Sequence, residues 1–220
     1  CIIGCLIAGR IADTYGRKPG LFAAASLFFL SSLSMGLAPS LSWFITSRFM
    51  AGIGVGMASM LSPMFIAEIS PAGVRGRLVA INQLTIVLGQ VITHFENFQL
   101  RNVGPEAWRW MFGLGTIPSL LFLTGVFFLP ESPRFLLNRG KEGQARRVLA
   151  RIGNNAFVEN SVAEIQSTLN KEVSSHIRSV FTRSVMPILL IGIGLAVFQQ
   201  FCGINVVFNY TTNIFRSIGA

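Results

Sequence analysis

Charged side chains are scarce in this 220-residue sequence, in which only 12% of the residues are Asp, Glu, Lys or Arg. Soluble domains carry about twice that fraction. The formal net charge of +9 alone would suggest a nucleic-acid partner, but such a partner needs a dense basic face, and long stretches here carry no charge. Disorder is excluded too, because 51% of the side chains are apolar. The composition therefore predicts a membrane protein whose charges lie mostly in its loops.

Residues that commonly serve catalysis or metal binding are also few. The sequence has a single aspartate, Asp13, and two histidines, His94 and His176, which fall in different predicted compartments. Its three cysteines show neither a disulfide framework nor a metal-ligand spacing. We therefore expect no enzymatic activity, no metal site and no cofactor.

Long apolar runs, in contrast, are abundant. A membrane-spanning helix needs roughly 20 apolar residues. Five segments meet this requirement, namely residues 20–38, 43–67, 78–95, 110–129 and 184–215. The shorter apolar run at residues 1–8 predicts the end of another helix. The sequence thus predicts an all-α membrane protein.

Basic residues are distributed unevenly among the connections between these helices. Alternate connections place fourteen Lys and Arg residues on one side of the membrane, against Arg101, Arg109 and Arg216 on the other. Cytoplasmic loops carry the excess of Lys and Arg, so the richer side is predicted to be cytoplasmic. Its longest connection, residues 130–183, has helical spacing at 141–152 and 159–173, which predicts a cytoplasmic helical linker.

Polar residues within the predicted span 78–95 and its continuation form a stripe. Gln83, Gln90, Thr93, His94 and Asn97 fall within about 100° of arc at helical spacing. Such residues can hold neighbouring helices together, or they can line a wet cavity. The shared face favours the cavity.

The last predicted span carries a second set of amides, at Gln199, Gln200, Asn205, Asn209 and Asn213. Gly203 can break the helix and let amides on both sides of it point inward, as in the discontinuous helices of transporters. Amides offer both donors and acceptors, and this set includes no carboxylate. The pattern therefore favours a neutral ligand with many hydroxyl groups.

Arg48 is the one formal charge within a complete predicted span. A guanidinium at that depth requires an acidic partner or a water-filled pocket. Because the complete spans contain no Asp or Glu, its partner would be a group outside them or a lipid phosphate. Alternatively, the side chain extends to the nearby outer interface.

Three cytoplasmic connections carry similar charge motifs: GRIADTYGRK at residues 9–18, EISPAGVRGR at 68–77 and PESPR at 130–134. Acids and guanidiniums at helix ends can form ion pairs that join helices in one state and break in another. The alternative is ordinary solvated surface charge. Together with QQFCGIN at 199–205, these motifs resemble, in order and spacing, the sugar porter family of the major facilitator superfamily.

The resemblance implies a fold of twelve helices in two six-helix bundles, of which this chain would be a fragment from late helix 2 to helix 7. Residues 1–129 would belong to the N-terminal bundle, 130–183 would form the cytoplasmic linker, and 184–220 would contain the first helix of the C-terminal bundle.

The resemblance also implies roles for individual residues. Sugar ligands would be Gln83, Gln199, Gln200 and Asn205, with Asn209 standing where the family has a tyrosine. Arg48 would partner a helix 1 aspartate in proton-coupled members. A cytoplasmic charge network would contain Asp13, Arg17, Glu68, Arg75, Glu131 and Arg134.

The expected function is sugar transport across the cell inner (plasma) membrane by alternating access, as proton symport of a pentose or hexose such as D-xylose. A proton-independent facilitator, a porter-like sugar sensor and a polyol transporter are the alternatives. The expected partners are a small sugar, protons and membrane lipid, with no nucleic acid.

Overall fold

The computed structural model describes residues 1–172 and 186–203, and within these ranges it is helical without strands. Contacts between residues divide the chain into two compact units, Cys1–Gln166 and Ser167–Ala220. Four helical segments are long and apolar enough to cross a membrane: Arg17–Gly36, Leu41–Ile69, Gly73–Leu100 and Ala107–Phe128. They correspond to the first four spans predicted from the sequence.

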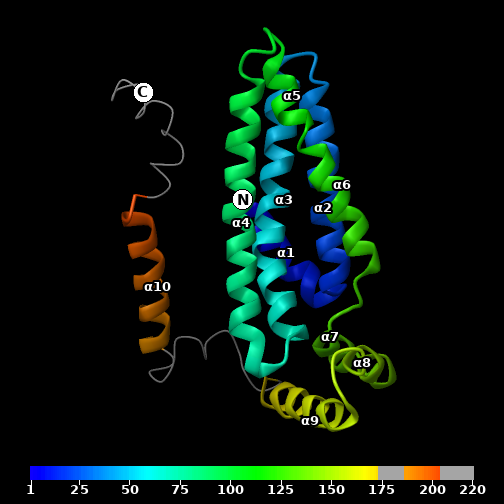
Figure 1. Cartoon of the computed structure of the whole chain (residues 1–220). Helices are drawn as coiled ribbons and strands as arrows, with labels where there is room; N and C mark the ends of the chain where they lie inside the picture. The colour runs from blue at the N-terminus through cyan, green and yellow to red at the C-terminus, as the bar shows by residue number, and fades with distance from the viewer. Residues whose placement is uncertain (173–185, 204–220) are drawn as a thin grey trace. The chain divides into compact units, whose positions relative to one another are not determined.

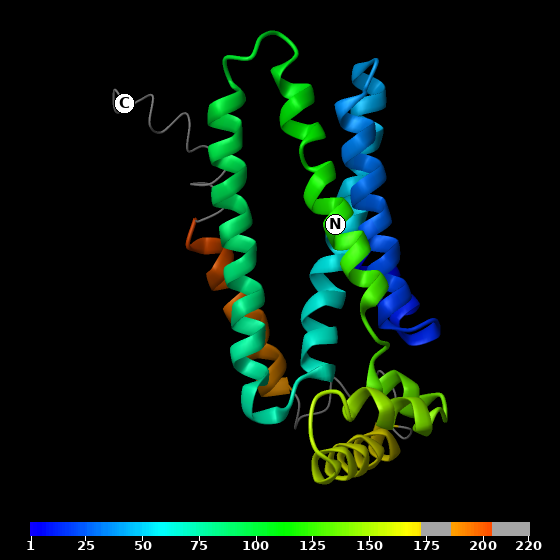
Figure 2. The same cartoon turned by 45° about the vertical axis from the view of Figure 1, so that its right-hand side comes forward.

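The first unit contains most of the helices (Figures 1 and 2). In chain order they are α1 (Ile2–Thr14), α2 (Arg17–Gly36), α3 (Leu41–Ile69), α4 (Ala72–Leu100), α5 (Ala107–Gly113), α6 (Thr116–Phe128), α7 (Pro133–Asn138), α8 (Glu142–Leu149) and α9 (Asn155–Glu172), the last of which continues into the second unit. The C-terminal ends of α1 and α3 lie at the same end of the bundle as α7 and α8 (Figure 1). This end carries the connections that the charge distribution predicts to be cytoplasmic.

The close approach of α1 to α3 depends on small residues. A Cβ atom at Gly4 would overlap the carbonyl oxygen of Ile53 and lie 3.1 Å from the Cα of Gly56. Side-chain packing then continues from Ala8 and Ala12 on α1 to a core that also includes Leu21, Ala24, Met57, Leu61, Phe65 and Val126. Burial of these apolar groups joins α1, α2, α3 and α6.

The fourth predicted span is a pair of helices, because α5 ends at Gly113 and α6 begins at Thr116. Gly113 and Gly115 flank the junction, and glycine lowers helix stability by about 1 kcal/mol relative to alanine. Gly113 also lies against α2, where a Cβ at Gly36 would come within 2.9 Å of its Cα. Close contact between the backbones therefore accompanies the break.

Helix α4 is the most exposed of the spanning helices: no described side chain between residues 73 and 100 is buried. It contacts α3 through Asn82, whose side-chain oxygen accepts a hydrogen bond from Ser62 at 3.2 Å. Apolar side chains such as Leu84, Ile92 and Phe95 remain exposed along it.

The described part of the predicted linker, residues 130–172, contains the two predicted helices and one more. Helix α7 begins where the Ser132 side chain accepts a hydrogen bond from the backbone N–H of Phe135, with Pro133 in the first turn. Helices α8 and α9 pack together through Leu149, Val158 and Val162. Helix α7 could not be predicted from the sequence, because a helix of six residues is too short to show a periodic apolar pattern.

In the second unit, α10 (Met186–Phe201) is the described part of the fifth predicted span. The helix ends two residues before Gly203, whose φ of 69° is in the left-handed region that glycine adopts without a steric penalty. This agrees with the predicted break. Residues 204–215 of that span lie outside the described residues.

Candidate functional site

The end of the first unit that is predicted to be cytoplasmic holds a compact ion-pair cluster. Arg17 lies in the first turn of α2 and Glu68 in the last turn of α3, and the Arg17 Nη2 to Glu68 Oε1 distance is 2.8 Å. The Arg17 Nε donates to the same oxygen at 3.2 Å, and Nη1 donates to the carbonyl of Ala12 at 2.8 Å. Only 11% of the Arg17 side chain and 9% of the Glu68 side chain are exposed. The pair therefore joins α1, α2 and α3 in a poorly solvated position.

Glu131 adds the α6–α7 connection to this cluster. One of its carboxylate oxygens accepts hydrogen bonds from the backbone N–H groups of Arg17 at 2.9 Å and Lys18 at 3.1 Å. The first N–H groups of a helix have no partner within the helix, and the N-terminus attracts negative charge. Glu131 therefore caps α2 from more than a hundred residues away along the chain.

The conformation of Gly16 makes this cap possible. Its φ is 110°, which L side chains rarely adopt, and a Cβ there would overlap the Glu131 carboxylate. The sequence GRK therefore places the glycine where the acid must approach the backbone.

Ser132 connects the two acids. Its hydroxyl donates to Glu68 Oε2, and its backbone N–H donates to Glu131 at 2.9 Å. Ser132 is fully buried. Ser132 is not among the residues predicted from the sequence, although it lies within the PESPR motif between Glu131 and Arg134, which are.

The other three predicted members of the network lie around this cluster. Asp13 approaches Arg17 at 3.9 Å and is exposed. Arg75 is exposed on the first turns of α4 and lines a cleft of about 360 Å³ that Glu68, Phe157 and other residues also line. Arg134 is half-buried on α7. The structure therefore brings Arg17, Glu68 and Glu131 into direct contact, with Asp13 at the margin.

Further contacts fix the linker to the bundle. The Arg139 guanidinium donates to the carbonyl of Thr14 at the end of α1. Lys18 donates from its Nζ to the carbonyl of Phe127 at 2.9 Å, at the end of α6. A cation near a helix C-terminus is favourable. Arg139 carries no sequence signal that distinguishes it from solvated surface charge, whereas Lys18 is the last residue of the GRIADTYGRK motif.

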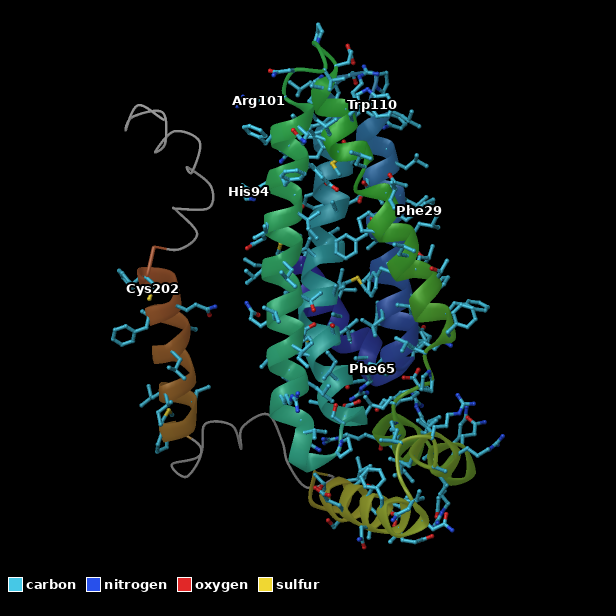
Figure 3. All side chains as sticks on the ribbon, viewed as in Figure 1. Phe29, Phe65, His94, Arg101, Trp110 and Cys202 are labelled. Carbon is cyan, nitrogen blue, oxygen red and sulfur yellow. The ribbon has the colours of Figure 1, made fainter. Side chains whose placement is uncertain are left out.

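Gln83 is exposed on α4, as are Gln90, Thr93, His94 and Asn97 of the predicted stripe. Asn82, which contacts α3, lies about 100° from Gln83 around the helix. The stripe therefore borders the face of α4 that packs on α3, and Figure 3 shows His94 on the side away from α3. Thr93 and His94 make hydrogen bonds to the carbonyls of Gly89 and Gln90 one turn earlier.

Gln199 is exposed on α10, and Gln200 belongs to the same helix. The remaining two predicted sugar ligands, Asn205 and Asn209, lie outside the described residues.

Arg48 is exposed on α3, with its guanidinium carbon 5.1 Å from the centre of the Phe112 ring. Phe112 belongs to an aromatic group in which Phe44 packs edge-on against both Trp108 and Phe112. A guanidinium over an aromatic face is attracted by its quadrupole. Within the described ranges, the structure gathers no set of three His, Cys, Asp or Glu side chains that could hold a metal ion.

The family model described as "Sugar (and other) transporter" matches residues 1–220. The chain belongs to the sugar transporter family. It is 38% identical to the D-xylose-proton symporter of Escherichia coli (strain K12), over 100% of this chain and 49% of that protein. It is 39% identical to the glucose transport protein of Synechocystis sp., over 99% of this chain and 49% of that protein. It is also 37% identical to the probable inositol transporter 2 of Arabidopsis thaliana, over 99% of this chain and 39% of that protein.

Solved structures of sugar transporters resemble the fold of this chain. A double-tryptophan mutant of XylE superposes with a TM-score of 0.88 at 36% identity, over 100% of this chain and 51% of the other. XylE bound to 6-bromo-6-deoxy-D-glucose gives a TM-score of 0.85 at 37% identity, over 99% of this chain and 51% of the other. These comparisons confirm the predicted major facilitator fold. The relatives are transport proteins, in agreement with the expectation that the chain is not an enzyme, and the chain spans about half their length.

Proposed function

We propose that this chain forms part of a transporter that moves a sugar across the inner (plasma) membrane by alternating access, coupled to protons. The structural observation that carries the proposal is the ion pair between Arg17 and Glu68, together with the Glu131 cap. These contacts join the cytoplasmic ends of three helical segments through a few charged groups. Such contacts are strong enough to favour one arrangement of helices, and they can break when another is stabilised.

The family supports the substrate class. Relatives that match this chain over 99% or more of its length are named for D-xylose, glucose and inositol. XylE structures are described as inward open and as partially occluded inward open, so this fold is seen in more than one conformation. We assign residues 1–129 to an N-terminal bundle, 130–183 to the cytoplasmic linker and 184–220 to the start of a second bundle.

We place the sugar at Gln83, Gln199, Gln200, Asn205 and Asn209. The exposed position of Gln83 beside the α3-facing side of α4 leaves its amide available to a ligand. A sugar hydroxyl both donates and accepts, as an amide does, so such a set can satisfy several hydroxyl groups.

A binding experiment on the full-length protein tests this assignment. Gln83→Ala and Gln199→Ala should each weaken D-xylose or glucose binding about fivefold, the effect of losing one hydrogen bond of about 1 kcal/mol. Thr85→Ala is the matched control, because Thr85 lies on the opposite face of α4 and bonds the carbonyl of Ile81. Isothermal titration calorimetry would measure the affinities, on variants first shown to insert into the membrane as the wild type does. Equal affinities in all variants would contradict the assignment.

Proton coupling is assigned to Arg48, which lies exposed over an aromatic ring in the N-terminal half of α3. In proteoliposomes, sugar uptake should rise with an inward proton gradient and collapse with a protonophore. Arg48→Leu should lower this gradient-driven accumulation while leaving exchange of sugar at equal pH. Uptake that ignores both pH and protonophore would identify a facilitator, and binding without uptake would identify a sensor.

A polyol is the second candidate substrate, because the Arabidopsis relative is named a probable inositol transporter. The same amides would accept a cyclic polyol as readily as a sugar. Competition of myo-inositol with radiolabelled D-xylose in the uptake assay would separate the two substrates.

A further inference from the structure

A cleft of about 280 Å³ lies where the span α5–α6 reaches its cytoplasmic end. The end of α6 contributes Phe128 and Leu129, and α8 with the residues after it contributes Gln144, Arg147, Val148 and Arg151. One wall is therefore apolar and continuous with a membrane helix, while the other carries two guanidinium groups.

The arrangement of α8 explains why both basic groups reach the same cleft. Gln144, Arg147 and Val148 are three and four positions apart on one face of α8, and Arg151 follows two residues after the helix ends at Leu149. The neighbouring Arg146 points elsewhere, because it pairs with Glu142 at 2.8 Å and with Glu159 on α9. The helix thus separates a guanidinium that holds the linker together from two that face the cleft.

The carboxylate in this cleft already has its own partners. Glu131 accepts hydrogen bonds from the backbone N–H groups of Arg17, Lys18 and Ser132. Arg147 donates from Nε to the carbonyl of Gly143 at 3.2 Å, which leaves its two terminal nitrogens as donors. The cleft can therefore present a positive surface to a ligand.

The apolar wall indicates what that ligand is. Phe128 is 82% exposed at the end of a helix that is long and apolar enough to cross the membrane. A soluble anion would use the guanidiniums but gain nothing from the exposed ring, whereas a phospholipid matches both walls. We propose that this cleft binds the headgroup of an anionic phospholipid of the cytoplasmic leaflet, with the phosphate on Arg147 and Arg151 and the acyl chains along Phe128. Guanidinium groups suit phosphate because their planar donors bind two oxygens at once.

Native mass spectrometry of the detergent-solubilised full-length protein tests the proposal, with phosphatidylglycerol and phosphatidylcholine as probes. The wild type should retain phosphatidylglycerol in preference to phosphatidylcholine. Arg147→Gln/Arg151→Gln should weaken phosphatidylglycerol binding about thirtyfold, since each basic side chain near an anionic lipid surface contributes about fivefold. Arg147→Lys/Arg151→Lys keeps both positive charges, so this variant should retain most of the preference for phosphatidylglycerol over phosphatidylcholine.

Arg10→Gln/Arg77→Gln is the matched control, because it removes two exposed charges from the same membrane side outside the cleft. A loss of lipid in this control equal to that in the cleft variant would show a general electrostatic effect and overturn the proposal. Displacement of the lipid by excess inorganic phosphate would show a soluble-anion site, and a wild type without lipid preference would show no site. Circular dichroism and gel filtration would establish that each variant is folded. If the double lysine variant bound phosphatidylglycerol as weakly as the double glutamine variant, the proposal would also be contradicted.

Discussion

The guanidinium of Arg17 contacts the carboxylate of Glu68 at 2.8 Å, between the first turn of α2 and the last turn of α3. Removing one member of a poorly solvated pair leaves the other charge without compensation, which can cost about 3–5 kcal/mol. The two residues are fifty-one positions apart, so the pair acts on the arrangement of helices.

We expect a double-mutant cycle to show this coupling. Arg17→Gln and Glu68→Gln should each lower the stability of the full-length protein, and the double variant should be about 1–3 kcal/mol more stable than the sum of the two effects predicts. Denaturant unfolding in detergent would give these values. As the control, Asp13→Asn combined with Arg17→Gln should show a coupling below about 0.5 kcal/mol, because Asp13 is 82% exposed. Additive effects at Arg17 and Glu68 would contradict a direct interaction.

The Glu131 cap predicts a graded response to substitution. Glu131→Ala should destabilise the protein by about 1–2 kcal/mol, because the N–H groups of Arg17 and Lys18 lose their acceptor. Glu131→Gln keeps an acceptor oxygen but loses the charge, so it should lie between alanine and the wild type. Thermal unfolding in detergent would rank the three proteins. A glutamine variant less stable than the alanine variant would contradict a capping role.

The α1–α3 contact predicts opposite outcomes for two glycines on one helix. Gly4→Ala would place its Cβ against the carbonyl of Ile53, so the helices must separate and stability should fall by about 1–3 kcal/mol. Gly9→Ala is the matched control, since its Cβ would meet only the flexible end of Met60 at 3.4 Å. The higher helix propensity of alanine should make this variant neutral or up to about 1 kcal/mol more stable. Equal stability of the two variants would contradict the close packing.

The linker offers a prediction about pH. Hydrogen bonding from Arg146, supported by its charge, lowers the pKa of Glu159. The pair therefore stabilises the contact of α8 with α9 above the ordinary pKa of a glutamate, and this contribution is lost as the pH falls through the lowered value. NMR titration of carbon-13-labelled glutamate should show Glu159 protonating at lower pH than an unpaired glutamate. Arg146→Gln should return its midpoint towards the ordinary value, and an unchanged midpoint would contradict the pairing.

Much of this arrangement could be predicted because it depends on local patterns. Apolar runs define the first four spans within a few residues. The separation of basic residues predicts their orientation. The interruption between α5 and α6 could not be predicted, because two glycines in an apolar run are also compatible with a continuous helix. It coincides with the approach of Gly36 to Gly113, a contact between distant parts of the chain.

The candidate site shows the same limit. The motifs indicated Arg17, Glu68 and Glu131 as charged groups on one membrane side. The charges alone do not predict which acid pairs with which base. The role of Glu131 depends on a backbone turn at Gly16 that brings the acid against the start of α2. Ser132 has no charge, and its importance follows only from the two carboxylates that converge on it.

The Glu131 cap has a consequence for the order of events during biosynthesis. The first turn of α2 is stabilised by a carboxylate that lies 114 residues later in the chain. The N–H groups at the start of α2 cannot gain this acceptor until the ribosome has made Glu131, after all the residues of α6. The cap of α2 is therefore completed only after the chain has been synthesised as far as the α6–α7 connection.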